Sequence, residues 1–463
     1  MLNDFLNLCG FDKNDIEREK ENIEKAFSLL NITSYDVERS IPFVKRMFDV
    51  ELLGIRKCLG VALKELVNMV LARERYKKII YVTQPIFSPP WEAAMEAGGG
   101  EVLAVTPEFL LCMTMGGMLD KYEFILEAAE EKGLRAGGAH CGSHQFRLGG
   151  IAKGIIPIPD LIVSLGSYYC DQSGELDNLF NNVYGIPVAY IDGSMDTIQD
   201  DYPAVSPRRV QYAAQSMRRA EARIEELIGK KITDEMKRNA LIAVGRTWKP
   251  FQDIVDFLKF DPVPISAADI TQLFYLQAIP LVYREELIKA LDILKGELKE
   301  RVDKGVGILP KGAPRIYFGM FPLVNQEVAK MVEEIGMASV ALPIITMCSD
   351  ERAKGVFKMF EERLIEAMHK KGLYHSGLGM ARYIKDICAE HKVEGAIIFV
   401  PYNCRPMSYP AVMAKEMVVN ELGIPAMLLE GDWYDNRDYS AQALRTRVET
   451  FAGMLKSRTV KHG

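Results

Sequence analysis

The chain has 463 residues, of which 48% are hydrophobic and 26% are charged, a balance typical of a soluble globular protein of two or three domains. Its 57 basic and 63 acidic residues give a net charge of −6, so no general basic field is available for a nucleic acid. Eight cysteines are too few for a disulfide framework in a chain of this length, and no run of 18 apolar residues predicts a membrane span.

The N-terminal part is predicted to be helical. Residues 1–74 carry apolar side chains at helical spacing and are expected to form a helical arm. The first 20 residues mix acidic residues with apolar ones and lack the basic segment and apolar core of a signal peptide. We therefore expect a cytoplasmic protein with reduced thiols.

Residues 75–205 are predicted to form a first α/β domain. Short apolar runs alternate here with helical patterns, which is typical of a parallel sheet with crossover helices. The predicted strands are Lys78–Pro85, Glu101–Thr106, Asp160–Leu165 and Ile186–Ile191.

The rest of the chain repeats this plan after a helical segment. Residues 206–305 are predicted to be a helical connector, with helical patterns over Arg208–Gly229, Asp234–Lys259 and Ile265–Leu298. Residues 306–463 are predicted to form a second α/β domain. Its predicted strands are Arg315–Gly319, Ala338–Ile345, Gly395–Val400 and Ile424–Leu429.

The two predicted α/β domains resemble each other in detail. Each has a strand, then a cysteine (Cys170 or Cys404), then Gly-Ile-Pro and another strand. Upstream, Cys141 and Ser376 occupy similar places, 29 and 28 residues before those cysteines. Any two doubly wound units share a general pattern, but matched cysteines and Gly-Ile-Pro positions favour a true repeat. The predicted fold is α/β: two similar doubly wound parallel-sheet domains with a helical connector and an N-terminal helical arm.

Three cysteines are candidate ligands because of where they stand. Sites in open parallel sheets lie beyond the carboxyl ends of the strands, where Cys170 and Cys404 fall. Cys141 precedes a predicted helix in a glycine-rich stretch. The alternative is that each is an ordinary buried thiol, since free cysteine is among the most buried residue types.

The spacing of these cysteines indicates what they would bind. The close CxxC pairs of structural zinc sites are absent, as are the local cysteine spacings of ferredoxins. Three thiolates brought together from separate loops would suit an iron–sulfur cluster with one iron left open. Such an iron could act as a Lewis acid toward a substrate oxygen.

Three polar residues near these positions are candidates for catalysis. Ser88 could donate to a carbonyl group, and Glu92 could act as a base in a cleft. The alternative is that they begin a helix, where an acidic residue is favoured by the helix dipole. His140, beside Cys141, is equally well explained as an acid or base or as a hydrogen-bonded loop histidine. The sequence contains no G-x-x-x-x-G-K-[ST] loop for ATP.

The order of these segments resembles the 2-hydroxyacyl-CoA dehydratase family, which includes the core subunits of benzoyl-CoA reductase. The resemblance is clearest in Val393–Asp432, which begins VEGAIIFVPYNCRPMSYP and ends ELGIPAMLLEGD, and in the following Arg445–Glu449. Gly229–Ser266 is similar to the helical middle of that family, and Pro159–Asp171 to its second cysteine region. In all, the resemblance extends from about residue 75 to residue 455.

The resemblance implies a cofactor and partners. Members bind a [4Fe–4S] cluster through three cysteines, which map to Cys141, Cys170 and Cys404. They pair with a homologous second subunit as heterodimers, and a separate ATP-dependent iron–sulfur activator protein supplies a strongly reducing electron. The implied substrate is an acyl-CoA thioester, and the missing ATP loop is compatible with a separate activator.

The implied reaction is elimination of water from a 2-hydroxyacyl-CoA. One electron added to the thioester carbonyl gives a ketyl radical anion, and loss of the 2-hydroxyl group to the open iron makes the β-hydrogen far more acidic. Our hypothesis is that Ser88 or a backbone N–H binds the carbonyl and that Glu92 or His140 moves a proton. Two alternatives stay open: a benzoyl-CoA reductase subunit, or an electron-relay subunit if Cys348 is a fourth ligand that closes the cluster.

Overall fold

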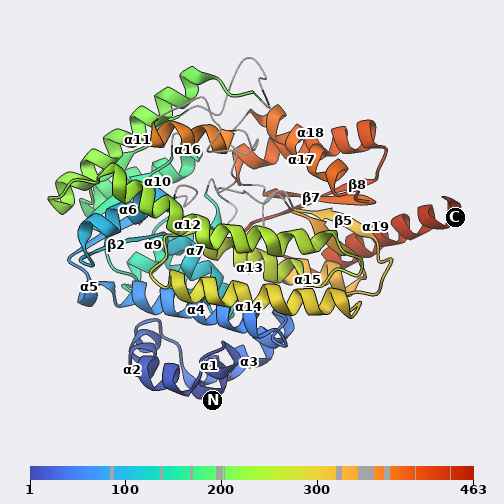
Figure 1. Cartoon of the computed structure of the whole chain (residues 1–463), viewed down its shortest axis with the longest axis horizontal. Helices are drawn as coiled ribbons and strands as arrows, with labels where there is room; N and C mark the ends of the chain where they lie inside the picture. Colours follow the sequence, from blue (N-terminus) through green and yellow to red (C-terminus); the bar gives the residue numbers. More distant parts are fainter. Residues whose placement is uncertain are drawn as a thin grey trace.

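Two four-stranded parallel sheets form the centre of the fold (Figure 1). The first has the strand order β2-β1-β3-β4 and the second the order β6-β5-β7-β8, so the two sheets share one topology. Their strands are β1 (Lys78–Val82), β2 (Val102–Val105), β3 (Leu161–Ser164), β4 (Val188–Tyr190), β5 (Arg315–Phe318), β6 (Ala338–Ala341), β7 (Gly395–Pro401) and β8 (Ala426–Gly431). The predicted fold class, two similar doubly wound parallel-sheet domains, is confirmed.

The structure is a computed structural model. It describes residues 1–83, 88–135, 138, 140–166, 170–193, 202, 204–319, 326–342, 359–369, 376–401, 403–437 and 439–462. Cys348 lies outside the described residues, as do the ends of the strands predicted over Lys78–Pro85 and Ala338–Ile345.

Side chains buried on both faces are typical of parallel strands that lie between layers of helices. Every residue of β2, β3 and β6 is buried, which requires helices on both sides of each sheet. In the first sheet these helices include α6 (Ser88–Gly98), α7 (Pro107–Leu111), α8 (Glu123–Glu131), α9 (Gly142–Ala152) and α10 (Asp171–Tyr184). The second has α15 (Gln326–Glu334), α17 (Gly377–Glu390), α18 (Arg405–Leu422) and α19 (Ala441–His462). Helix α16 (Phe360–His369) packs instead against α11 (Pro207–Ile228).

The repeated Gly-Ile-Pro has the same structural role in both units. Gly185 and Gly423 end α10 and α18 with φ angles of +67° and +68°, a left-handed conformation that glycine adopts without steric cost. The prolines two residues later lead directly into β4 and β8. Their carbonyl groups accept the N–H groups of Ile162 and Ala396, each at 2.9 Å. The matched sequence therefore reflects a matched helix-to-strand turn.

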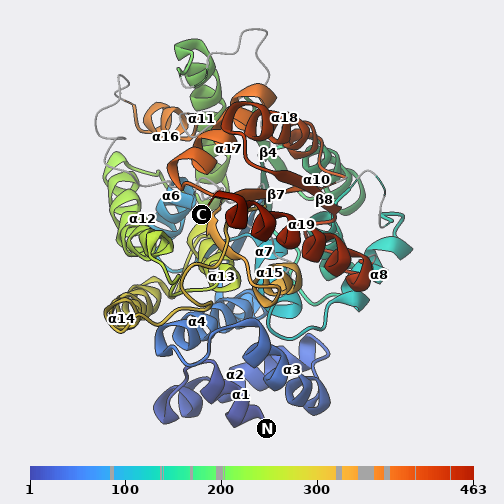
Figure 2. The same cartoon turned by 90° about the vertical axis from the view of Figure 1, so that its right-hand side faces the viewer.

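Helices make up the arm and the connector. The arm contains α1 (Leu2–Leu8), α2 (Lys13–Leu29), α3 (Ser34–Met47), α4 (Leu53–Val70) and α5 (Ala72–Arg75), and α1 to α3 lie at one end of the molecule (Figures 1 and 2). The connector contains α11 (Pro207–Ile228), α12 (Asp234–Val255), α13 (Ala267–Ala278) and α14 (Arg284–Asp303), with α14 lying along α4. The helical pattern over Ile265–Leu298 is thus two helices, because Pro280 lacks an N–H and disfavours helix in the residue before it.

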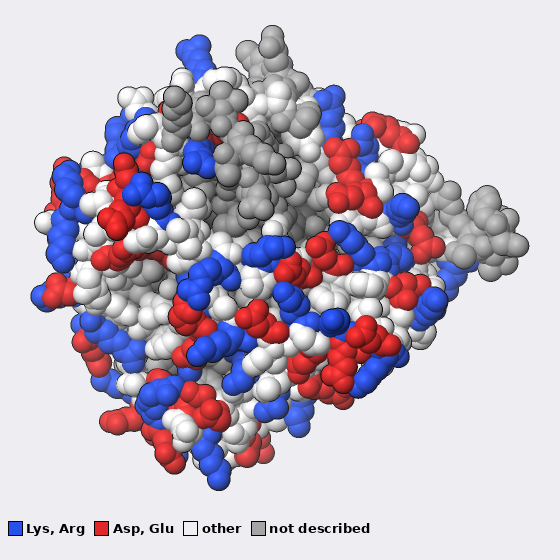
Figure 3. All heavy atoms as spheres, in the orientation of Figure 1, with Lys and Arg blue, Asp and Glu red and all other residues white. Residues whose placement is uncertain are grey.

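The surface offers no single strong feature on the face shown in Figure 3. Basic and acidic side chains are interspersed there. Among the helices that the structure describes, none is long and apolar enough to cross a membrane.

A buried carboxylate connects the arm to the connector. Glu65 on α4 accepts the backbone N–H groups of Val282 and Tyr283, at 2.8 and 2.7 Å, just before α14 begins. Burial raises the pKa of Glu65 to about 7. Because this pKa exceeds the ordinary value of about 4.3, the folded protein binds more protons than the unfolded chain between these pH values. This group therefore makes the free energy of unfolding fall as the pH rises from about 4 to about 7.

We expect the Glu65→Gln variant to lose this part of the pH dependence while keeping an acceptor for both N–H groups. From about pH 5 to about pH 8, the free energy of unfolding of the wild type should fall by about 2 kcal/mol more than that of the variant. Urea unfolding at each pH measures this difference. Glu297→Gln is the matched control, since Glu297 accepts two N–H groups at the start of α4 but is only partly buried. Identical pH profiles for wild type and Glu65→Gln would contradict the prediction.

Candidate functional site

Each of the three candidate cysteine ligands is the N-cap residue of a helix. Cys141 precedes α9, Cys170 precedes α10 and Cys404 precedes α18. An N-cap side chain lies beside the first-turn N–H groups, which have no partner within the helix. Cys170 and Cys404 also follow β3 and β7, at the carboxyl ends of strands in the two sheets.

None of the three sulfur atoms forms a side-chain capping hydrogen bond, but nearby backbone N–H groups lower the pKa of each thiol. These groups belong to Ser143 and His144 for Cys141, to Gln172 and Ser173 for Cys170, and to Met407 for Cys404. The second residue of α18 is Pro406, which has no N–H to offer. Helix N-termini and N–H donors favour the thiolate form, which is the form that binds metals.

The structure brings the three thiols into electrostatic reach of one another. The thiols of Cys170 and Cys141 both raise the pKa of Cys404, and Cys141 raises the pKa of Cys170. Burial is the larger cause in each case, and it raises the pKa of Cys141 to about 11 and that of Cys170 to about 12. Without a cation the three groups therefore stay protonated at neutral pH, whereas binding a metal would release their protons.

No three or more His, Cys, Asp or Glu side chains in the described part of the chain are already grouped to hold a single metal ion. A cluster binds each thiolate through a different iron, so its protein ligands need not share one metal-sized position.

One of the four equivalent helix N-caps in the repeat is a serine. In the second unit the residue equivalent to Cys141 is Ser376, the N-cap of α17, whose hydroxyl accepts the Gly379 N–H at 3.1 Å. The N-caps of α9 and α10 thus carry two thiols, and those of α17 and α18 carry a hydroxyl and a thiol.

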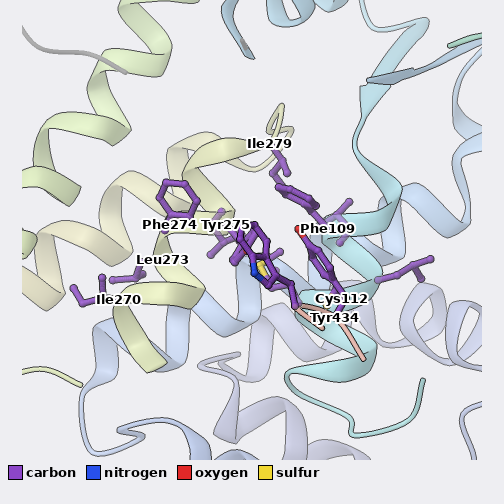
Figure 4. Packing of buried hydrophobic residues seen from close by; sticks show 14 of the residues in the cluster. Phe109, Cys112, Ile270, Leu273, Phe274, Tyr275, Ile279 and Tyr434 are labelled. Atoms are coloured by element: carbon purple, nitrogen blue, oxygen red, sulfur yellow. The ribbon is translucent and has the colours of Figure 1, made fainter. Parts of the chain in front are cut away.

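Of the other described cysteines, only Cys112 lies within electrostatic reach of the site. Asp432 and the Cys141 thiol both raise its pKa, after the larger effect of burial. Cys112 begins a π-helix (Cys112–Gly116) and is packed among Phe109, Tyr275 and Tyr434 (Figure 4). Cys9, Cys58 and Cys388 are buried in the hydrophobic core. Sequence reasoning did not select Cys112 as a candidate ligand, and the structure shows it as a buried thiol near the site.

Two histidines lie beside the cysteines. The Nδ1 atoms of His140 and His144 are 3.2 Å apart, and Nε2 of His144 is 4.0 Å from Sγ of Cys170. Nε2 of His140 is 4.0 Å from a carboxylate oxygen of Glu175, whose side chain is 65% exposed. Burial lowers the pKa of both histidines, well below the usual range for His144. The predicted site residue His140 therefore lies next to the cysteines on one side and close to the exposed carboxylate of Glu175 on the other.

Ser88 and Glu92 lie on α6, and their surroundings differ. Ser88 is buried, and its hydroxyl has no hydrogen-bond partner among the described residues. Glu92 is buried in an ion pair with Arg284 of α14, which also donates to Thr247 at 3.0 Å. Neither side chain forms a hydrogen bond or ion pair with the cysteine loops in the described part of the chain. The roles of Ser88 and Glu92 stay predictions.

Two residues that sequence reasoning missed connect the cysteine loops. Asp432, at the end of β8, accepts the backbone N–H of Gly142 at 3.2 Å. Asn403 donates from Nδ2 to Asp432 at 2.6 Å and to the carbonyl of His140 at 3.0 Å. The available signal was the position of each residue in the chain. Asn403 precedes Cys404, and Asp432 directly follows β8, at the carboxyl edge of the sheet.

Comparison with known proteins places these features in a family. A family model described as 2-hydroxyglutaryl-CoA dehydratase, D-component, matches residues 105–455. This chain is 22% identical over 317 residues to the alpha subunit of (R)-2-hydroxyglutaryl-CoA dehydratase from Acidaminococcus fermentans, covering 66% of this chain and 63% of that one. The match therefore spans less than two thirds of that relative's length.

Two further relatives carry similar names. The alpha subunit of (R)-phenyllactyl-CoA dehydratase from Clostridium sporogenes is 25% identical over 301 residues, covering 64% of this chain and 70% of the relative. The alpha subunit of lactoyl-CoA dehydratase from Anaerotignum propionicum is 21% identical over 326 residues, covering 65% and 70%.

Proposed function

We propose that this chain, which belongs to the 2-hydroxyglutaryl-CoA dehydratase D-component family, is a subunit of an enzyme that eliminates water from a 2-hydroxyacyl-CoA. One observation carries the proposal: the N-cap cysteines of α9, α10 and α18 come from separate loops and lie within electrostatic reach of one another. Cys170 is buried, and Cys141 and Cys404 pack against the hydrophobic core. Grouped in this way, the three thiols are also a ligand set for an iron–sulfur cluster.

The donor set fits a [4Fe–4S] cluster held by Cys141, Cys170 and Cys404. Thiolates are the ligands such clusters prefer, and N–H donors to the sulfur atoms tune the reduction potential. When bound, the cluster would supply a low-potential electron and one iron open to a substrate oxygen. The fourth equivalent N-cap is a serine whose hydroxyl already caps its own helix.

Protein side chains would orient the substrate and move its proton. His140 is the better candidate for the proton step, because its lowered pKa leaves the imidazole neutral and able to accept a proton. Glu92 is the weaker candidate, because its carboxylate is held by Arg284. Ser88 is the candidate for the thioester carbonyl, because its buried hydroxyl has no partner among the described residues and is a ready donor.

Two partner proteins complete the proposal. A homologous second subunit would form a heterodimer with this chain, which is supported by the subunit names of the relatives. A separate ATP-dependent activator would deliver the electron, since this chain contains no G-x-x-x-x-G-K-[ST] loop of its own.

The test is an anaerobic assay of the full chain with its partner subunit, an iron–sulfur activator, ATP and a chemical reductant. We expect 2-hydroxyacyl-CoA thioesters to give enoyl-CoA products, with no product when the activator or ATP is left out. Product from benzoyl-CoA alone would replace the proposal with an aromatic ring reductase. A cluster closed by a fourth protein ligand, Cys348, in a chain that the partner still needs for turnover would identify an electron-relay subunit instead.

A further inference from the structure

Two side chains of the second α/β unit hold both peptide groups that flank Cys141. Asn403 donates to the carbonyl of His140, on one side of this cysteine. Asp432 accepts the N–H of Gly142, on the other side. Asn403 and Asp432 also bind each other, at 2.6 Å. The loop carrying Cys141 is thus attached to the second unit by a short, closed set of hydrogen bonds.

The same two residues are fixed to the remaining parts of the site. Asn403 is bonded directly to Cys404 in the chain, so its position and that of the Cys404 thiol are coupled. Asp432 also accepts the N–H of Tyr434 at 2.8 Å. The Tyr434 ring is packed beside Phe109, with ring centroids 6.1 Å apart, and hydrogen-bonds to Tyr275 (Figure 4). The loop after β8 is therefore anchored in the core, which restricts its movement together with the Cys141 loop.

The contact between these two loops is buried and closely packed, so it leaves no room for a larger side chain. Asn403 is 6% exposed and Asp432 is 3% exposed. A Cβ atom added at Gly142 would lie 2.8 Å from Cβ of Tyr434 and 3.2 Å from a carboxylate oxygen of Asp432. The absence of a side chain at residue 142 is therefore required for the two loops to approach this closely.

We propose that Asn403 and Asp432 form an inter-unit clamp that sets the spacing of the Cys141 and Cys404 thiols for the cluster. This proposal rests on the proposed function, because it assigns positioning residues to the ligand set described there. Ligands contributed by two separate units need such a connection, since relative motion of the units would otherwise change the sulfur spacing. The clamp acts through the peptide groups on either side of Cys141.

The test compares variants of the full chain after anaerobic reconstitution with iron and sulfide. Asn403→Asp places an acceptor against Asp432 and against the His140 carbonyl, and Gly142→Ala forces the loops apart. For both we expect a chelator to remove iron about tenfold faster than from the wild type, with a changed electron paramagnetic resonance spectrum of the reduced cluster. The double variant Asn403→Asp/Asp432→Asn restores a donor and acceptor pair and should recover part of the retention.

Arg437→Gln is the matched control. It removes another contact between the same loop and the first unit, the ion pair of Arg437 with Glu130 at 2.5 Å, without touching the cysteine loops. Wild-type iron release and spectrum in Asn403→Asp, or equally fast release in Arg437→Gln, would overturn the clamp.

Hydrogen exchange in cluster-free protein tests the clamp independently of cluster binding. In cluster-free protein, hydrogen exchange over residues 140–144 should be faster in Asn403→Asp than in the wild type and unchanged in Arg437→Gln. A wild-type chain that binds no iron would refute the proposed function, while unchanged exchange in Asn403→Asp would refute the clamp alone.

Discussion

A Cys404→Ala variant is expected to hold fewer than half of the roughly four irons that the reconstituted wild type should contain per chain. Removing Cys404 takes away the only candidate ligand from the second unit in the described part of the chain. The two remaining thiols come from the first unit, on α9 and α10, and would leave two irons without protein ligands. Dehydratase activity should fall below detection. Iron and sulfide analysis measures the first effect, and the anaerobic assay measures the second.

Cys388→Ala is the matched control. Cys388 is also in the second unit, on α17, and is 1% exposed in the hydrophobic core. Its replacement removes one buried sulfur atom and should lower stability by about 1 kcal/mol while leaving the iron content unchanged. Equal iron losses in the two variants would mean that Cys404 has only a structural role.

The sequence was sufficient to predict the fold because its signals are local and repeated. Apolar runs of strand length, Gly-Ile-Pro turns and helical patterns each depend on neighbouring residues, and all recur in both units. The end of a helix before Pro280 was missed because the helical spacing of apolar residues continues across this proline. The positions of the three cysteines could be predicted for the same reason, since they follow from strand order and helix starts, while their role as ligands stays a proposal.

The contacts between the units could not be predicted in this way. Asn403 and the Cys141 loop are more than 260 residues apart in the chain, and nothing local at either place indicates the other. The partner of Glu92 is Arg284, 192 residues away, so a carboxylate that looks like a base in the sequence is an ion-paired carboxylate in the fold. Pairings of this kind depend on how whole elements pack, which no short sequence pattern encodes.

An Arg147→Met variant is expected to lose about 3 to 5 kcal/mol of unfolding free energy, the largest stability effect that we predict. Arg147 on α9 and Asp177 on α10 are both 0% exposed and form an ion pair at 2.8 Å. Glu108 approaches the same guanidinium group at 3.8 Å. Removing the arginine would leave two buried carboxylates without their cation, and the cost of burying an unpaired charge greatly exceeds the worth of a surface ion pair.

The ion pair matters to the site because it joins the two helices that begin at Cys141 and Cys170. Urea unfolding of cluster-free protein at about pH 7 measures the loss, which should shrink at about pH 5, where the carboxylates can take up protons. The double variant Arg147→Met/Asp177→Leu removes one of the stranded charges and should regain part of the stability. Arg246→Met, which breaks an exposed ion pair with Glu285, should change stability little. A loss in Arg147→Met no greater than that in Arg246→Met would show that the buried pair does not hold the two cysteine-bearing helices together.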